Sequence, residues 1–154
     1  MIFVLFSISI NGVSDMTAQR FSRRDASLKK TKALPSGASS VYSDPINMES
    51  GSKGAVLVDG EFLITAPAAA VGELANTETL VYFLQDAPSD SWGSARALSG
   101  TLITQTGAGG AGAAAQTRRF RPPTDCQKYV RLGCTKTGGT GNASTMTVIL
   151  ELLT

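Results

Sequence analysis

Hydrophobic residues in this chain come in short runs, several of which alternate with polar residues. The clearest alternation covers residues 128–135 (KYVRLGCT). One face of that segment holds Tyr129, Arg131, Gly133 and Thr135, and the other holds Val130, Leu132 and Cys134. A period of two residues is typical of a half-buried β-strand. We therefore predict a strand here, with the Val-Leu-Cys face toward a core.

Other segments rich in β-branched and aromatic residues predict further strands. They are a short one around Val41 and Tyr42 and longer ones at residues 55–58, 62–65, 79–85, 97–104 and 144–153. The pair Asp59-Gly60 lies between two of them and predicts a hairpin. The turn sequence TGGTGN at residues 137–142 joins the last two strands. We expect these two strands to form a C-terminal hairpin.

No segment keeps a helical period over ten residues. The best helix candidate, residues 66–76, is short and contains Pro67 and Gly72. Seven to nine short strands separated by turn residues predict an all-β antiparallel sandwich or barrel. The sandwich is expected to occupy residues 41–154, preceded by an N-terminal arm at residues 1–40.

Composition narrows the function classes. The chain has 154 residues, a net charge of +2, 17% charged residues and no histidine. It is too apolar for a disordered chain, and too weakly basic to bind nucleic acid through overall charge. The lack of histidine removes the usual general base and the commonest metal ligand. We expect no catalysis, no metal and no cofactor.

Two cysteines, Cys126 and Cys134, lie in what reads as a single strand. Eight residues of extended chain span roughly 26 Å, whereas a disulfide needs Cα atoms within about 7 Å. We therefore expect two reduced thiols, as in proteins assembled in a reducing cytoplasm.

The N-terminal region combines an apolar start with a basic run. The start, MIFVLFSISI, lacks a preceding basic residue and a cleavage site, and it is too short to span a membrane. We expect a strand, or an arm that packs on a neighbour. The basic run holds Arg20, Arg23, Arg24, Lys29, Lys30 and Lys32. It fits a solvated linker or an extended arm lying on an acidic protein surface, and nucleic-acid contact is less favoured.

A second basic group, Arg118, Arg119 and Arg121, follows the low-complexity segment GAGGAGAAA at residues 107–115. The glycines lack the Lys and Ser/Thr of a phosphate-binding loop, so a flexible surface loop is expected. The arginines fit either protection of an edge strand against aggregation or a contact with another subunit or protein.

Two other constellations favour different classes of protein. Trp92 lies near Asp86 and Asp90 in sequence, which could serve carbohydrate recognition, although a lone Trp more often anchors a loop. Asp59 and Glu61 could form a carboxylate pair, but they flank a turn glycine and fit solvated turn residues better.

From about residue 43 onward the order of features resembles the small jelly-roll capsid cement (decoration) proteins of tailed bacteriophages. A small-residue segment (66–75) precedes TLVYFLQDA (79–87), then a loop with the lone Trp92 and an Ala/Gly-rich turn. The C-terminal PPTDCQKYVRLGCTKTGGTGNASTMTVILEL carries the most specific pieces, YVRL at 129–132 and GGT at 138–140. Residues 1–40 depart from the pattern.

This resemblance implies a jelly-roll β-sandwich without catalytic activity. It implies a homo-oligomer, with a dimer favoured and a trimer possible, that binds the major capsid protein on the outside of the virion shell after synthesis in the bacterial cytoplasm. The two basic groups are the expected contacts, with no direct role for nucleic acid or membrane. The alternative is a carbohydrate- or receptor-binding sandwich of a phage particle.

Overall fold

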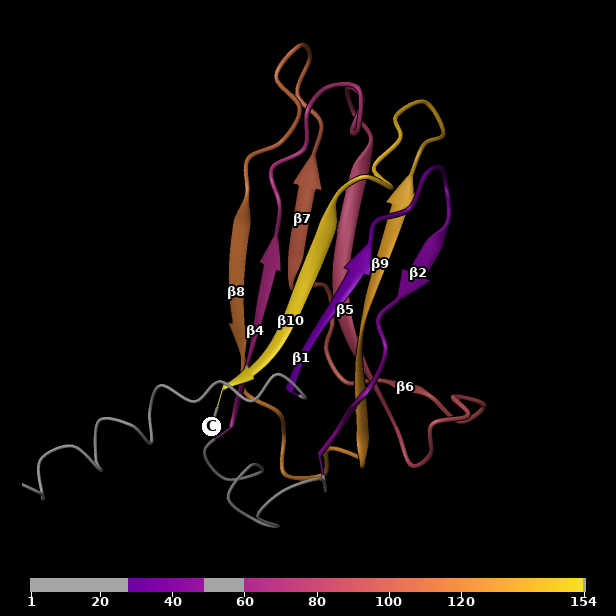
Figure 1. Ribbon diagram of the computed structural model, residues 1–154, viewed down its shortest axis with the longest axis vertical. Coiled ribbons are helices and arrows are strands. Elements are labelled where there is room, and N and C mark those ends of the chain that lie inside the picture. The colour runs from indigo at the N-terminus through magenta and orange to yellow at the C-terminus, as the bar shows by residue number, and fades with distance from the viewer. Residues whose placement is uncertain (1–27, 49–59, 154) are drawn as a thin grey trace, which may run out of the picture.

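The computed structural model describes residues 28–48 and 60–153, which form two antiparallel β-sheets packed face to face (Figure 1). The strands are β1 (Lys29–Ala33), β2 (Ser40–Tyr42), β3 (Ile46–Asn47), β4 (Glu61–Ala66), β5 (Thr79–Ala87), β6 (Arg96–Ala97), β7 (Ile103–Thr106), β8 (Gln116–Phe120), β9 (Tyr129–Thr137) and β10 (Thr147–Leu153). No α-helix occurs in these two ranges. The all-β antiparallel sandwich expected from the sequence is confirmed.

The strand order makes the sandwich a jelly roll. Sheet A has the order β1-β10-β4-β8, and sheet B has the order β2-β9-β5, with β6 and β7 both pairing with β5 and β3 pairing with β9. The main strands therefore pair from the outside of the chain inward: β1 with β10, β2 with β9, β4 with β8, and β5 with β7. Such a chain is one long hairpin, folded at β5–β7 and wound into two sheets.

The core lies between the sheets and follows from the alternation of each strand. In β4, β5 and β9 every second side chain is buried, including Phe62, Tyr82 and Leu132. The two faces predicted for residues 129–135 are confirmed, because Val130, Leu132 and Cys134 are buried and the alternate positions face outward.

The predicted C-terminal hairpin is wrong. β9 belongs to sheet B and β10 to sheet A, so the TGGTGN turn carries the chain across the sandwich instead of returning it beside β9. Turn residues fix a change of direction, but they do not fix which sheet receives the next strand. The hairpin predicted at Asp59-Gly60 would pair β4 with the preceding strand, but β10 and β8 occupy the two edges of β4. Its first strand, residues 55–58, lies outside the described residues.

Two further expectations change. The strand predicted at 97–104 is two pieces, β6 and β7, separated by residues 98–102. Lys29–Ala33, assigned to the arm, is an edge strand of sheet A, so the sandwich includes residues before the predicted boundary at 40. The segment 107–115 lies mostly at the surface as a loop, and bridges between Ala108 and Gly112 and between Ala69 and Ala113 close it.

Candidate functional site

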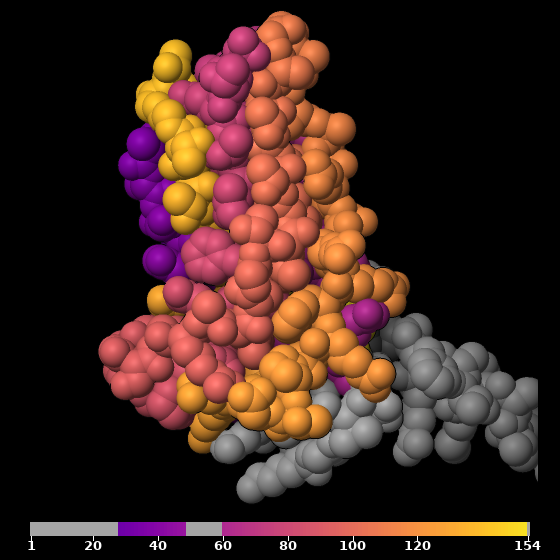
Figure 2. Space-filling view, turned by 180° about the vertical axis from the view of Figure 1, so that it is seen from behind, coloured from indigo at the N-terminus to yellow at the C-terminus, as the bar shows by residue number. Residues whose placement is uncertain are grey.

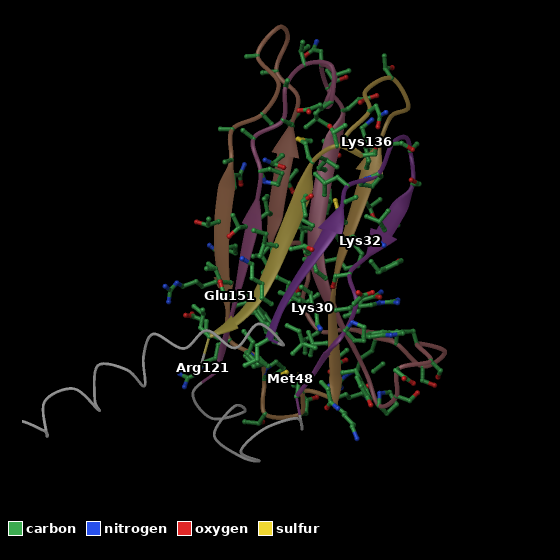
Figure 3. The ribbon with its side chains drawn as sticks, viewed as in Figure 1. Lys30, Lys32, Met48, Arg121, Lys136 and Glu151 are labelled. Carbon is green, nitrogen blue, oxygen red and sulfur yellow. The ribbon has the colours of Figure 1, made fainter. Side chains whose placement is uncertain are left out.

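The basic residues singled out from the sequence do not form one cluster. Arg20, Arg23 and Arg24 lie outside the described residues. Lys29, Lys30 and Lys32 lie on β1, whereas Arg118, Arg119 and Arg121 lie on or just after β8. These strands are opposite edges of sheet A, separated by β10 and β4, or about 14 Å at ordinary strand spacing. Figure 3 shows Lys30 and Lys32 on β1 and Arg121 across the sheet from them.

Register shows how the edge cations are oriented. Lys30 and Lys32 pair with the buried Leu150 and Val148, and Arg118 pairs with the buried Ile64. These basic residues therefore occupy core-side positions on edge strands. Inward-pointing charges on an edge prevent a second chain from adding to the sheet, so both edges of sheet A carry this protection.

Arg119 lies on the outer face of sheet A and is already paired. Its Nη1 donates to Glu61 Oε2 at 2.8 Å, on the neighbouring strand β4. Both side chains are substantially solvent-exposed, so this ion pair contributes little to stability.

The outer face of sheet B carries a group that the sequence did not reveal, hereafter the Arg131 cluster. It consists of Tyr42 from β2, Phe83 and Gln85 from β5, Trp92 from the β5–β6 loop, and Arg131 from β9. Figure 2 shows this face, with the salmon segment between β5 and β6 projecting at its lower corner. The other end of the same face is an ordinary polar surface, where the hydroxyls of Thr79 and Thr137 are hydrogen-bonded to each other at 2.7 Å.

Arg131 lies between two aromatic rings. Its guanidinium carbon is 4.0 Å from the ring centroid of Tyr42 and 4.0 Å from that of Trp92. Its Nε and Nη2 both donate to Gln85 Oε1, at 3.1 and 2.9 Å. Partial burial lowers the pKa of Arg131 from its usual value. Within the described ranges no carboxylate forms an ion pair with it.

Gly133 makes room for this arrangement. It lies opposite both Tyr42 and Phe83 in the register of β9. A Cβ atom on Gly133 would lie 2.5 Å from the Phe83 ring. Without that atom the Tyr42 and Phe83 rings meet edge to face, with centroids 6.3 Å apart and planes at 80°.

Trp92 anchors its loop, but not beside the carboxylate expected from the sequence. It packs on Arg131 with a φ of 56°, in the left-handed region that non-glycine residues rarely adopt. Asp86 instead points into the sandwich, fully buried, and accepts from Arg96 Nε at 2.8 Å and Nη2 at 3.0 Å. The backbone N–H of Gln127 also donates to Asp86, so this carboxylate ties β6 and the β8–β9 loop to β5. The expected grouping of Trp92 with Asp86 is therefore wrong.

A buried ion pair holds the loops at the other end of the sandwich. Lys136 Nζ donates to Glu78 Oε2 at 2.6 Å, with 2% and 7% of the two residues exposed. Glu78 also accepts backbone N–H groups of Thr140, Gly141 and Ala75. The bond from Lys136, followed by that from Thr140, lowers the pKa of Glu78 to about 2. Figure 3 shows Lys136 near the loop end of β9. With every charge satisfied inside the fold, this pair is structural.

Of the two cysteines, Cys134 is buried and Cys126 is partly buried. Cys126 and Cys134 are free thiols, as expected, although Cys126 precedes β9 instead of sharing it. Burial raises the pKa of both thiols to about 12. Across residues 28–48 and 60–153, no group of three His, Cys, Asp or Glu residues could hold a metal ion.

The alternation of residues 129–135 places Arg131 on the outer face, and this is the one sequence signal that points toward the cluster. Its aromatic neighbours come from positions 42, 83 and 92. A single sequence does not show that these positions converge.

Comparison with known protein families and with curated proteins finds no match to this chain. In the described part of the chain, no helix has the length and apolar character needed to cross a membrane.

Proposed function

We propose that this chain is a capsid cement protein, a structural component of a bacteriophage virion. It binds the outer surface of the shell built from the major capsid protein and clamps neighbouring capsomers. It acts as a homo-oligomer, with a dimer favoured and a trimer possible, and it is made in the bacterial cytoplasm. No catalysis is part of this role.

The observation that carries the proposal is the pairing of the main strands from the outside of the chain inward. The resemblance to cement proteins, which rests mainly on the segments at 66–75, 79–87 and 122–152, implies a jelly roll. The strand order β1-β10-β4-β8 and β2-β9-β5-β7 has that connectivity. The resembling segments include β5, β9 and β10, which are inner strands of the two sheets.

The charged and reactive groups of the described residues support a role in binding. The carboxylates of Asp86 and Glu78 form internal ion pairs, and the Cys134 thiol is buried while that of Cys126 is partly buried. Surface cations lie at both edges of sheet A; Arg119 on the β8 side is already paired with Glu61, and Lys29, Lys30 and Lys32 lie on the β1 side of the sandwich. An acidic shell surface would complement that side, and many copies of a modest contact add up on a repeating lattice.

The test is co-sedimentation of the purified full-length protein with empty shells of the phage that encodes it, assembled without it. Light scattering of the free protein gives its oligomeric state. The proposal expects saturable binding by a small oligomer at a fixed ratio to the capsid protein. Pelleting no greater than that of an unrelated protein of equal mass would reject it.

A second candidate, a glycan- or receptor-binding sandwich of the phage particle, is favoured by one observation. The Arg131 cluster gathers Tyr42, Phe83 and Trp92 on one sheet face, and aromatic side chains are common at sites that bind polar ligands through an apolar surface. Binding to a glycan panel, in the absence of binding to shells, would support this candidate over the cement role.

A further inference from the structure

The outer face of sheet B is more apolar at one end than an exposed antiparallel sheet needs to be. The face of such a sheet that looks away from the core is usually solvated and polar. Here the Arg131 cluster places Tyr42, Phe83 and Trp92 on that face. All three are half-buried, and the threonine-rich end of the same sheet lacks such residues. Tyr, Trp and Arg are the residue types that dominate binding energy at protein interfaces.

We propose that the Arg131 cluster is the docking point of this protein on the capsid shell, and that its occupant is a carboxylate side chain of the major capsid protein. The inference rests on the proposed function and adds the face and the chemistry of the contact. It selects the outer face of sheet B over the β8 edge of sheet A.

The geometry of Arg131 argues for a carboxylate. A guanidinium has five N–H donors, and two of them are used on Gln85 Oε1. Three N–H groups are left with no acceptor among the described residues. The two aromatic rings cover the faces of the guanidinium, so only its edge can bind a partner. A planar edge carrying parallel N–H groups matches a carboxylate, which can accept two of them at once.

The surroundings of Arg131 make that bond worth more than a surface ion pair. Stacking on Tyr42 and Trp92 removes water from both faces of the cation, and burial already disfavours its charge. A carboxylate would compensate this charge without having to order a flexible side chain, because the rings and Gln85 hold Arg131 in place. The unusual backbone of Trp92, with a φ of 56°, is a local cost of keeping its ring over Arg131.

The lateral position of the cluster agrees with the charge distribution. Its outermost strand, β2, is an edge of sheet B and lies on the same side of the sandwich as β1, the edge of sheet A that carries Lys29, Lys30 and Lys32 (Figure 1). Lys30 and Lys32 occupy core-side positions and Lys29 the outer face of sheet A, so these lysines share the lateral edge with the cluster while the contact itself rests on Arg131. Arg118 and Arg119 lie at the opposite edge, on β8, and serve as an internal comparison.

The experiment measures binding of four full-length proteins to empty shells over a range of protein concentrations. They are the wild type, Arg131→Gln, Arg131→Lys and the charge-matched control Arg118→Gln. Thermal unfolding of each variant is recorded first. Trp92→Leu provides a second probe that keeps the cation and removes one of its rings.

We expect Arg131→Gln to weaken binding more than tenfold and Arg118→Gln to change it less than threefold. Arg131→Lys keeps the charge but loses the planar donor edge, so it should also weaken binding at least fivefold. Trp92→Leu should fall between the wild type and Arg131→Gln.

Each of the other outcomes has a distinct meaning. If the wild type does not bind shells, the proposed function fails. If the wild type binds and Arg131→Gln, Arg131→Lys and Trp92→Leu bind equally well, the cement role survives and the docking site is wrong. A third outcome is that the wild type binds a glycan panel, and that Arg131→Gln loses this glycan binding but binds shells as well as the wild type does. That result would likewise overturn the carboxylate as the occupant. If one of the three variants Arg131→Gln, Arg131→Lys and Trp92→Leu unfolds at a much lower temperature than the wild type, the docking site is judged from the other two.

Discussion

Replacing Tyr82 by phenylalanine removes one hydroxyl from the centre of the sandwich. Tyr82 lies on β5 with none of its surface exposed, and its hydroxyl donates to Gln105 Oε1 at 2.8 Å. The amide nitrogen of Gln105 donates in turn to the carbonyl oxygens of Pro67 and Ala114, at 2.7 and 2.8 Å. These bonds join sheet B to the loops that lead out of β4 and into β8.

The magnitude follows from the acceptor that is left behind. In Tyr82→Phe the Oε1 atom of Gln105, a residue that is 1% exposed, loses its partner. A buried polar atom without a partner costs about 1–3 kcal/mol. In a domain of this size 1 kcal/mol corresponds to about 2–4 °C. We expect a loss of about 2 kcal/mol and a fall in the melting temperature of about 4–8 °C.

The assay is urea unfolding, followed by circular dichroism and by the fluorescence of the single tryptophan, Trp92. Tyr129→Phe is the matched control, because that ring is only half-buried, and its effect should stay within about 0.5 kcal/mol. A double-mutant cycle of Tyr82→Phe with Gln105→Leu should give a coupling energy above about 0.5 kcal/mol. Additive effects in the cycle, or a Tyr82→Phe effect no larger than the control, would refute the reasoning.

Three other properties can be measured on the same protein. Because Glu78 has a pKa of about 2 in the folded state against an ordinary value of 4.5, its stabilising contribution is complete above pH 4.5 and falls as pH drops toward 2. The stability difference between wild type and Glu78→Gln, followed by urea unfolding, should therefore shrink from pH 4.5 to pH 2. A difference that stays constant would contradict the bond from Lys136. Gly112 has a φ of 67°, and in Gly112→Ala the new Cβ would lie 1.9 Å from the carbonyl oxygen of Ala69, so we expect the free energy of unfolding to fall by about 1–3 kcal/mol. Gly100→Ala, whose Cβ would lie in open space, should change stability little. Equal melting temperatures of the two variants would refute this. Cys126 and Cys134, with pKa values of about 12, should react slowly with an aromatic disulfide reagent at pH 8 and fast in denaturant, and fast labelling of the native protein would show that they are not enclosed.

The fold class could be predicted from sequence because it depends on local pattern. The alternation around Leu132, the β-branched run at β5 and the absence of helical periodicity each reflect one segment and its burial. Strand pairing depends on contacts across the whole chain. Lys29–Ala33 reads as a charged arm, yet it pairs with β10 more than 110 residues later. The TGGTGN turn is equally compatible with a hairpin and with a crossing between sheets.

For the candidate site, too, the features set by local sequence could be predicted and those that depend on long-range pairing could not. The outward position of Arg131 and the loop-anchoring role of Trp92 could be anticipated from their local sequence. Their meeting could not, because it needs β2 beside β9, β9 beside β5 and the β5–β6 loop folded back over both. Among the basic residues of the sequence interpretation, those that the structure describes lie at two separate edges of one sheet.

The most direct test of the central claim is an electron cryomicroscopy comparison of empty shells with and without the added protein. The account predicts extra density on the outer surface, repeated at fixed symmetry positions, into which the jelly roll fits with the Arg131 cluster against the capsid protein. Outer density with sheet B turned away from the shell would keep the cement role and reject the docking site. Shells that look the same with and without the protein would contradict the account.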